Sequence, residues 1–142
     1  MAELFDVSLS ARDEAFSTEE LKAAVADCDV FVPTVTDQID ADVIAAAGER
    51  LKLIANFGAG VDHIDLAAAR AKGIMVSNTP GVFTEDTADM TMALILSVPR
   101  RLAEGEKLMR SGQWAGWAPS AMLGHRVGGK LLGIVGMGRI GL

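Results

Sequence analysis

Residues 51–65 read LKLIANFGAGVDHID, a strand pattern that runs into a glycine turn and then a helix start. The apolar run Leu51–Phe57 predicts a strand. Gly58-Ala59-Gly60 predicts a tight turn at its end, because glycine adopts backbone conformations that other residues avoid. Asp65 can cap a short helix, since its carboxylate accepts hydrogen bonds from the free N–H groups of a first helical turn. This order is typical of one unit of an α/β domain with a parallel sheet.

The segment before this unit repeats the pattern. Ser17 and Glu20 have the spacing of a capping box, which predicts that a helix begins there. The apolar residues of this helix fall on one face at helical spacing: Leu21, Ala24, Val25 and Cys28. The continuous apolar run Val30–Val32 predicts a strand that is buried on both faces. A second helix is expected from its cap, Asp40, to about Gly48.

Further elements are expected on both sides. The start of the chain, Leu4–Leu9, predicts a short strand, and Ile74–Val76 predicts another. A long amphipathic stretch then runs from about Glu85 to Met109, with Thr84 as its cap. Pro99 interrupts this stretch, so we expect a kink or two successive helices.

The end of the chain carries a glycine pattern. An apolar strand is expected at Leu131–Val135, and Gly136-x-Gly138-x-x-Gly141 follows it. In dinucleotide-binding folds the first glycine allows the tight turn, the second lets backbone approach the pyrophosphate, and the third lets helix and strand pack closely. The pattern predicts a phosphate-binding turn, and the alternative is a glycine-rich turn without a ligand. A Rossmann unit needs a helix and a second strand after this turn, so we expect the chain to be part of a longer protein.

Composition excludes several classes of function. The 142 residues include 19 acidic and 13 basic ones, for a formal net charge of −6. Without a basic run, such a chain is a poor candidate for binding nucleic acid or a membrane surface. One cysteine favours a reducing compartment, and two histidines make a multi-histidine metal site unexpected. No apolar run approaches the ~18–20 residues of a membrane span. We therefore expect a cytoplasmic protein that binds no metal, nucleic acid or membrane.

Several spaced motifs resemble one family. They are Asn56–Asp65, Gly73-Ile74, Asn78–Gly81, Thr84–Asp89, Trp114-x-x-Trp117 and Gly129–Gly141. Together they resemble the D-isomer-specific 2-hydroxyacid dehydrogenases, and within that family the glyoxylate and hydroxypyruvate reductases. The resemblance implies three parts: a flavodoxin-like, parallel-sheet substrate domain in residues 1–110, an interdomain or dimer arm in 111–130, and the start of an NAD(P)-binding Rossmann domain in 131–142. Family members begin with a strand and helix ahead of the segment that matches Leu4–Leu9, so the substrate domain is expected to lack them.

The resemblance also implies roles for individual residues. The amides of Ala59 and Gly60 would bind the substrate carboxylate, and Val35 would form a wall of the substrate pocket. Thr87 would approach the nicotinamide. The residues that would bind the pyrophosphate are Gly136, Gly138, Arg139, Ile140 and Gly141. The alternatives are an ordinary strand-to-helix turn at the first two positions, core packing for Val35, and a solvent-facing helix position for Thr87.

No catalytic residue is expected within this chain. The family's catalytic arginine, glutamate and histidine lie beyond the glycine pattern. His63 is interpreted as a turn residue, and His125 has equally little support as a base. Asp62 is interpreted as a turn residue. Residues 1–142 alone are therefore expected to be inactive.

The implied reaction is hydride transfer between NAD or NADP and a small 2-keto or 2-hydroxy acid, such as glyoxylate or hydroxypyruvate. The expected assembly is a homodimer, in which Trp114 and Trp117 anchor contacts between the arms or, alternatively, form a local cluster over the cleft. One competing hypothesis is a non-catalytic dinucleotide-binding co-repressor or regulatory module of the same fold. Another is a flavin-binding domain, which ranks last because aromatic residues are scarce and tyrosine is absent.

Overall fold

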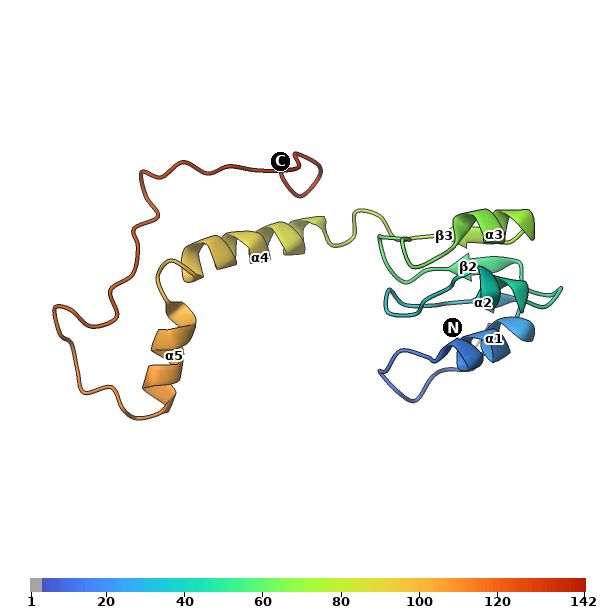
Figure 1. The fold of residues 1–142 in the computed structure, drawn as a ribbon, viewed down its shortest axis with the longest axis horizontal. Helices are drawn as coiled ribbons and strands as arrows, with labels where there is room; N and C mark the ends of the chain where they lie inside the picture. Colours follow the sequence, from blue (N-terminus) through green and yellow to red (C-terminus); the bar gives the residue numbers. More distant parts are fainter. Residues whose placement is uncertain (1–3) are drawn as a thin grey trace. The chain divides into compact units, whose positions relative to one another are not determined.

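The computed structural model describes residues 4–142 and divides the chain into two compact units, Met1–Pro80 and Gly81–Leu142. The first unit alternates helices and strands (Figure 1). Its elements are α1 (Thr18–Ala26), β1 (Val30–Phe31), α2 (Ala41–Ala45), β2 (Leu53–Ala55), α3 (Leu66–Ala71) and β3 (Met75–Ser77). The second unit contains α4 (Thr84–Ser97) and α5 (Leu102–Arg110). The finer boundaries expected at residues 110 and 130 stay predictions.

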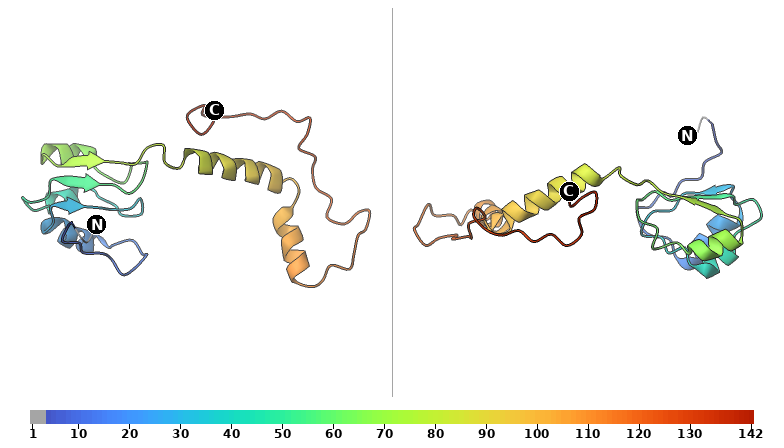
Figure 2. Two further views of the ribbon diagram at one scale, coloured as in Figure 1. Left: turned by 180° about the vertical axis from the view of Figure 1, so that it is seen from behind. Right: turned by 90° about the horizontal axis from the view of Figure 1, so that it is seen from above.

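The strands of the first unit form one parallel sheet in the order β1-β2-β3. In its register Val30 lies beside Leu53, and Leu53 lies beside Met75. Each crossover between neighbouring strands contains a helix, and α1, α2 and α3 all lie on one face of the sheet (Figure 2, right). The α/β class and the parallel sheet expected from the sequence are confirmed.

Local capping explains where the helices of the first unit begin. Ser17 and Glu20 form the predicted capping box, in which each side chain accepts a hydrogen bond from the other residue's backbone N–H. The carboxylate of Asp40 accepts from the N–H of Val43 at 2.9 Å. Asp65 caps α3 in the same way. These starts are confirmed because a cap depends only on residues within one turn.

The core lies between the helices and the sheet. Its buried side chains are Leu21, Val25, Ile39, Val43, Ile44, Leu51, Ile54, Ile64, Ala69 and Ile74. Full burial of a valine, leucine or isoleucine side chain stabilises the fold by roughly 1.5–3 kcal/mol. This core holds the ends of β1 and β2 in place, and the candidate site lies at those ends.

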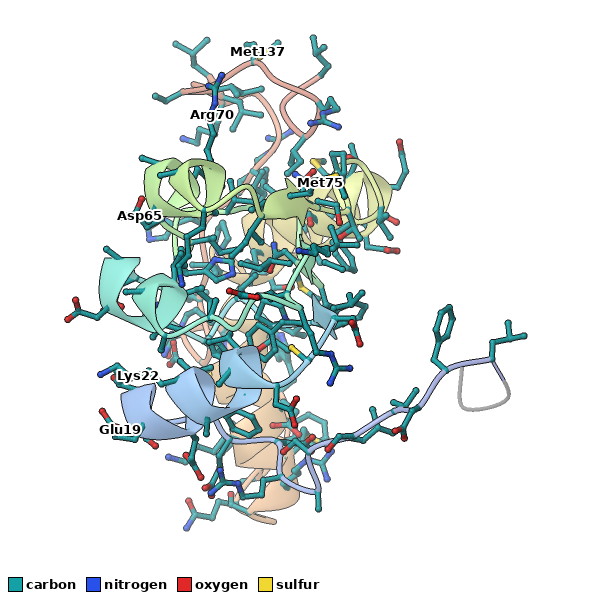
Figure 3. All side chains as sticks on the ribbon, turned by 90° about the vertical axis from the view of Figure 1, so that its right-hand side faces the viewer. Glu19, Lys22, Asp65, Arg70, Met75 and Met137 are labelled. Carbon is teal, nitrogen blue, oxygen red and sulfur yellow. The ribbon has the colours of Figure 1, made fainter. Side chains whose placement is uncertain are left out.

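The expectation that Val30–Val32 is buried on both faces is wrong. Val30 is 48% exposed, and Met75, which lies in the same row of the sheet on the far side of Leu53, is 64% exposed. Figure 3 shows Met75 on the side of β3 away from the helices. Within the described part of the first unit, α1–α3 cover one face only, so alternate residues of these apolar strands point away from the core.

Two expected strands are absent from the described residues. Leu4–Leu9 and Leu131–Val135 both lack regular structure, and Leu131 and Val135 are fully exposed. A strand exists through backbone hydrogen bonds to a neighbouring strand, and residues 4–142 provide none for either segment. An apolar run in the sequence does not by itself identify a pairing partner.

The second unit confirms that the long amphipathic stretch is interrupted at Pro99. Helix α4 ends at Ser97, and α5 begins after Arg101, whose φ of 58° is left-handed. Thr84 is not the cap, because it is the first helical residue and Phe83 occupies the cap position without a side-chain hydrogen bond. No helix in the described part of the chain is long and apolar enough to cross a membrane.

Candidate functional site

The turn Gly58–Gly60 lies just beyond the C-terminal end of β2. In open parallel sheets, ligands bind at this end of the strands. A second loop, between β1 and α2, lies beside the turn, since Thr34 forms a parallel bridge with Phe57. The first unit therefore places two strand-end loops next to each other.

The three carbonyl groups of Gly58–Gly60 are held by hydrogen bonds. The side-chain amide of Asn56 donates to the carbonyls of Gly58 at 3.1 Å and Gly60 at 2.8 Å. The side-chain amide of Asn78 donates to the carbonyl of Ala59 at 2.8 Å. The backbone N–H of Thr79 adds a second hydrogen bond to Gly58 at 3.0 Å.

These contacts determine where the N–H groups of the turn point. In a trans peptide the N–H points opposite to the preceding carbonyl. Because the carbonyls of Gly58 and Ala59 face the asparagine side chains, the N–H groups of Ala59 and Gly60 face away from them. Neither N–H donates a hydrogen bond to any group in residues 4–142. Successive free N–H groups in a turn form a site that suits an anion.

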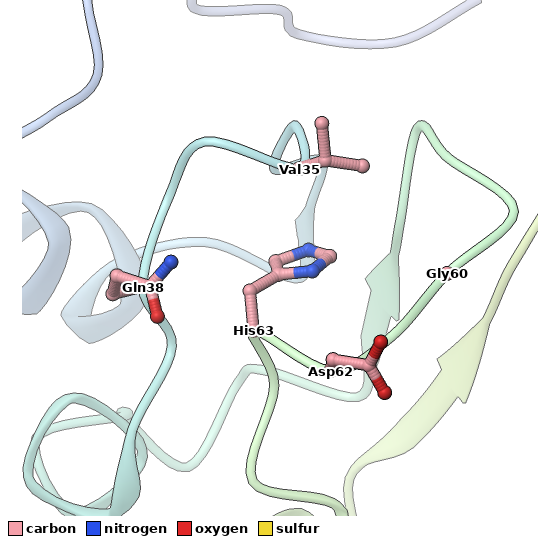
Figure 4. Close-up of a pocket in the computed structure, with 5 residues that line it drawn as sticks. All are labelled: Val35, Gln38, Gly60, Asp62 and His63. Carbon is pink, nitrogen blue, oxygen red and sulfur yellow. The ribbon is translucent and has the colours of Figure 1, made fainter.

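An open pocket of about 350 Å³ adjoins this turn. It is lined by Val35, Gln38, Gly60, Asp62 and His63 (Figure 4). The structure thus brings Gly60 and Val35 together, as the sequence analysis expects for a substrate pocket. Val35 is half-exposed and does not belong to the core cluster.

The loop that carries Val35 is held by a buried carboxylate. Asp37 accepts hydrogen bonds from the backbone N–H of Thr34 at 2.9 Å and of Phe16 at 3.2 Å. The second bond joins the loop to the segment before α1. The wall formed by Val35 is therefore fixed by groups from two parts of the chain.

Three further residues, for which the sequence indicates no functional role, contribute to this site: Asn56, Asn78 and Gln38. Asn56 is 2% exposed, and its Oδ1 lies 3.0 Å from Nε2 of His63. The available signal was a polar residue directly after an apolar strand, because a buried polar side chain must find hydrogen-bond partners. His63 lies in the turn as interpreted, but its ring also lines the pocket.

The glycine pattern near the C-terminus lies in the second unit. Gly136 has a φ of 96°, which disfavours any other residue. The N–H groups of Gly141 and Leu142 both donate to the carbonyl of Gly138 at 3.1 Å. A Cβ atom on Gly141 would lie 2.3 Å from the carbonyl oxygen of Gly136. The first and third glycines are therefore required by this turn.

The remaining predicted residues also lie in the second unit. Thr87 is exposed on the first turn of α4, and Arg139 and Ile140 lie within the glycine turn. His125 lies in the irregular segment after α5. In residues 4–142, no three His, Cys, Asp or Glu side chains are grouped so that they could hold a metal ion.

The sequence of the chain is similar to that of one family over most of its length. The family model for the D-isomer specific 2-hydroxyacid dehydrogenase catalytic domain matches residues 2–133. A glyoxylate reductase of Korarchaeum cryptofilum is 44% identical over 140 residues, which cover 98% of this chain and 42% of that protein. A glyoxylate reductase of Thermococcus onnurineus is 42% identical over 145 residues, or 99% of this chain and 43% of that protein.

Solved structures agree with the sequence comparison. A D-isomer specific 2-hydroxyacid dehydrogenase of Polaromonas has a TM-score of 0.90 at 40% identity, over 99% of this chain and 45% of that chain. D-lactate dehydrogenase of Aquifex aeolicus, complexed with NAD and lactic acid, has a TM-score of 0.71 at 30% identity, over 84% of this chain and 35% of that chain. The chain spans less than half the length of these relatives.

Proposed function

The chain belongs to the D-isomer specific 2-hydroxyacid dehydrogenase family, and we propose that it provides the substrate-carboxylate site of an NAD(P)-dependent oxidoreductase. The reaction is hydride transfer between the nicotinamide and a small 2-keto or 2-hydroxy acid, such as glyoxylate or hydroxypyruvate. The curated relatives named glyoxylate reductase favour this substrate class.

One observation carries the proposal: the N–H groups of Ala59 and Gly60 face away from the side chains that hold the neighbouring carbonyls. Two N–H donors on successive residues can bind the carboxylate of a 2-keto acid. The adjoining pocket of about 350 Å³ lies at the small end of ligand sites, which run to roughly 300–1,000 Å³. Val35 would contact the substrate beside the reacting carbon.

The residues of the second unit fit a dinucleotide. Gly136 and Gly141 have the backbone conformation and close approach that the pyrophosphate turn needs. Gly138, Arg139 and Ile140 would offer backbone N–H groups to the phosphates, and Thr87 would lie near the nicotinamide. Both NAD and NADP remain candidate cofactors. Among the structural neighbours, one is complexed with NAD and another with NADPH.

In this mechanism the chain binds and orients the substrate. The nicotinamide, when bound, supplies or accepts the hydride. The N–H groups of Ala59 and Gly60 hold the carboxylate, and this fixes the position of the adjacent 2-keto carbon. Val35 limits the size of the substituent on that carbon. By resemblance, the arginine and histidine that polarise and protonate the carbonyl lie outside residues 1–142, so this chain alone is proposed to be inactive.

The proposed assembly is a homodimer in which Trp114 and Trp117 anchor the contact. Trp117 is 84% exposed, so it does not take part in a buried local cluster within the described residues. Large aromatic side chains that are exposed in an arm are typical anchors of protein interfaces.

A chimeric enzyme tests the proposed function. Residues 1–142 are fused to the part of the Korarchaeum cryptofilum glyoxylate reductase that they do not match, which is more than half of that protein. We expect NAD(P)H oxidation that depends on glyoxylate, and none from residues 1–142 alone. A folded chimera that binds NADH without turnover would contradict the proposal and would favour the non-catalytic dinucleotide-binding module.

A further inference from the structure

We propose that Asn56 and His63 are positioning residues of the carboxylate site, with the neutral His63 ring carrying its hydrogen on Nε2. In this arrangement His63 orients the side-chain amide of Asn56, and Asn56 orients the peptides that follow Gly58 and Gly60. The link to a carboxylate rests on the proposed function, whereas the hydrogen-bond network does not.

Chemistry fixes the orientation of the Asn56 amide. The carbonyl oxygens of Gly58 and Gly60 can only accept hydrogen bonds, and both lie within 3.1 Å of the same side-chain atom. That atom must be Nδ2, because Oδ1 has no hydrogen to donate. Both Nδ2 hydrogens are thereby used, and Oδ1 faces the opposite direction.

The position of Oδ1 fixes the His63 ring. Nε2 lies 3.0 Å from Oδ1, which is hydrogen-bond distance. A ring nitrogen without hydrogen would place two acceptors in contact, so Nε2 must be the donor. The neutral ring then leaves Nδ1 without hydrogen. Figure 4 shows this ring among the side chains that line the pocket.

Burial makes Asn56 the fixed point of the network. Its backbone N–H donates to the carbonyl of Ser77 in β3 at 3.0 Å, so the residue is attached to the sheet. Asn56 is only 2% exposed. If its side-chain amide were rotated by about 180°, water could not replace the hydrogen bonds that the amide would lose. The groups of a binding site are positioned most precisely when they are attached to rigid elements such as the strands of a sheet.

The effect of Asn56 differs among the three peptides of the turn. The Gly58 carbonyl keeps a second donor from Thr79, and the Ala59 carbonyl is held by Asn78. For the carbonyl of Gly60, Asn56 is the only hydrogen-bond donor among the described residues. The peptide from Gly60 to Val61 therefore depends most on Asn56, and the Val61 N–H points away from it.

Ring-nitrogen NMR on the ¹⁵N-labelled 142-residue chain tests the assignment without any ligand. We expect one hydrogen on Nε2 of the neutral His63 ring and a bare Nδ1, with His125 as the internal comparison. A hydrogen on Nδ1 with a bare Nε2 would overturn the proposal. Because this measurement uses the unmodified chain, it does not depend on whether a variant folds.

Two substitutions separate positioning from general packing. The nitrogen of His63→Gln is the same number of bonds from the backbone as Nε2, whereas that of His63→Asn corresponds to Nδ1. We expect His63→Gln to keep the amide spectrum of Ala59 and Val61 and the affinity for glyoxylate. His63→Asn should lose the amide pattern and bind glyoxylate about 3–10-fold more weakly, which corresponds to one hydrogen bond.

If His63→Gln and His63→Asn have the same amide spectrum and the same affinity for glyoxylate, the positioning role is overturned. If the ring spectra are as expected but glyoxylate shifts no amide signal, the proposed carboxylate site is wrong and the network assignment stands. The two proposals therefore fail separately.

Discussion

A Cβ atom placed on Gly58 would lie 2.5 Å from Cγ1 of Val35, so the glycine turn is packed directly against the loop that forms the pocket wall. Val35 is β-branched and has little rotamer freedom with which to move aside. The two loops can therefore pack this closely only because Gly58 has no side chain.

Gly58→Ala is expected to destabilise the chain by about 1–3 kcal/mol, because it overpacks this contact. Urea unfolding followed by circular dichroism measures the change. Gly60→Ala is the matched control, since nothing lies within 4 Å of a Cβ atom there. It should leave stability unchanged or raise it by up to about 1 kcal/mol. Equal losses in the two variants would contradict the packing argument.

Asp37→Ala is expected to cost about 1–3 kcal/mol, since it leaves the N–H groups of Thr34 and Phe16 without their acceptor. The amide signals of both residues should shift in the same variant. Asp62→Ala, at an exposed position of the same site, should change stability by no more than about 0.5 kcal/mol. A stable Asp37→Ala variant with unchanged amide signals would refute the role of this carboxylate.

Glu20 is expected to make α1 sensitive to acid. Hydrogen bonds from the backbone and hydroxyl of Ser17, together with Arg12, lower the pKa of Glu20 from 4.5 to about 2. Because the folded-state pKa is the lower one, the stabilisation is fully present above about pH 4.5 and is lost as pH falls towards 2. The difference in unfolding free energy between the unmodified chain and Glu20→Gln should shrink over this interval.

Unfolding curves recorded between pH 6 and about pH 2 measure this dependence. Ser17→Ala provides the control background, because it removes one of the hydrogen bonds that lower the pKa of Glu20. The pH dependence of the Glu20→Gln effect should be weaker there. An effect that is constant with pH would show that the capping box does not stabilise the ionised carboxylate.

Gly141→Ala is expected to weaken NADH binding by the chimeric enzyme at least about tenfold, or ~1.4 kcal/mol. A Cβ atom there would collide with the carbonyl of Gly136 and open the phosphate turn. Gly133→Ala is the control, because nothing lies within 4 Å of its Cβ position. Fluorescence titration measures the affinity of both variants for NADH. If Gly141→Ala binds NADH as tightly as Gly133→Ala does, the turn is not the pyrophosphate site.

Elements that depend on neighbouring residues could be predicted from the sequence. Ser17, Asp40 and Asp65 cap helices as expected because each acts on N–H groups one turn away. Leu4–Leu9, by contrast, forms no strand, because pairing requires a partner that an apolar pattern does not specify.

The candidate site was predictable in part for the same reason. The glycines of the turn are visible in the sequence, and the resemblance adds Val35. The role of Asn56 could not be predicted, because it depends on which way the carbonyls of Gly58 and Gly60 point after the chain has folded. The contact between Asn56 and His63 likewise depends on the path of the turn.

Glyoxylate titration of the ¹⁵N-labelled chain, followed at the backbone amides, tests the carboxylate site most directly. The account predicts saturable shifts that are largest at Ala59 and Gly60, and no such shifts with methyl glyoxylate, which lacks the carboxylate. Unmoved signals at these two residues, or equal shifts with the ester, would contradict it.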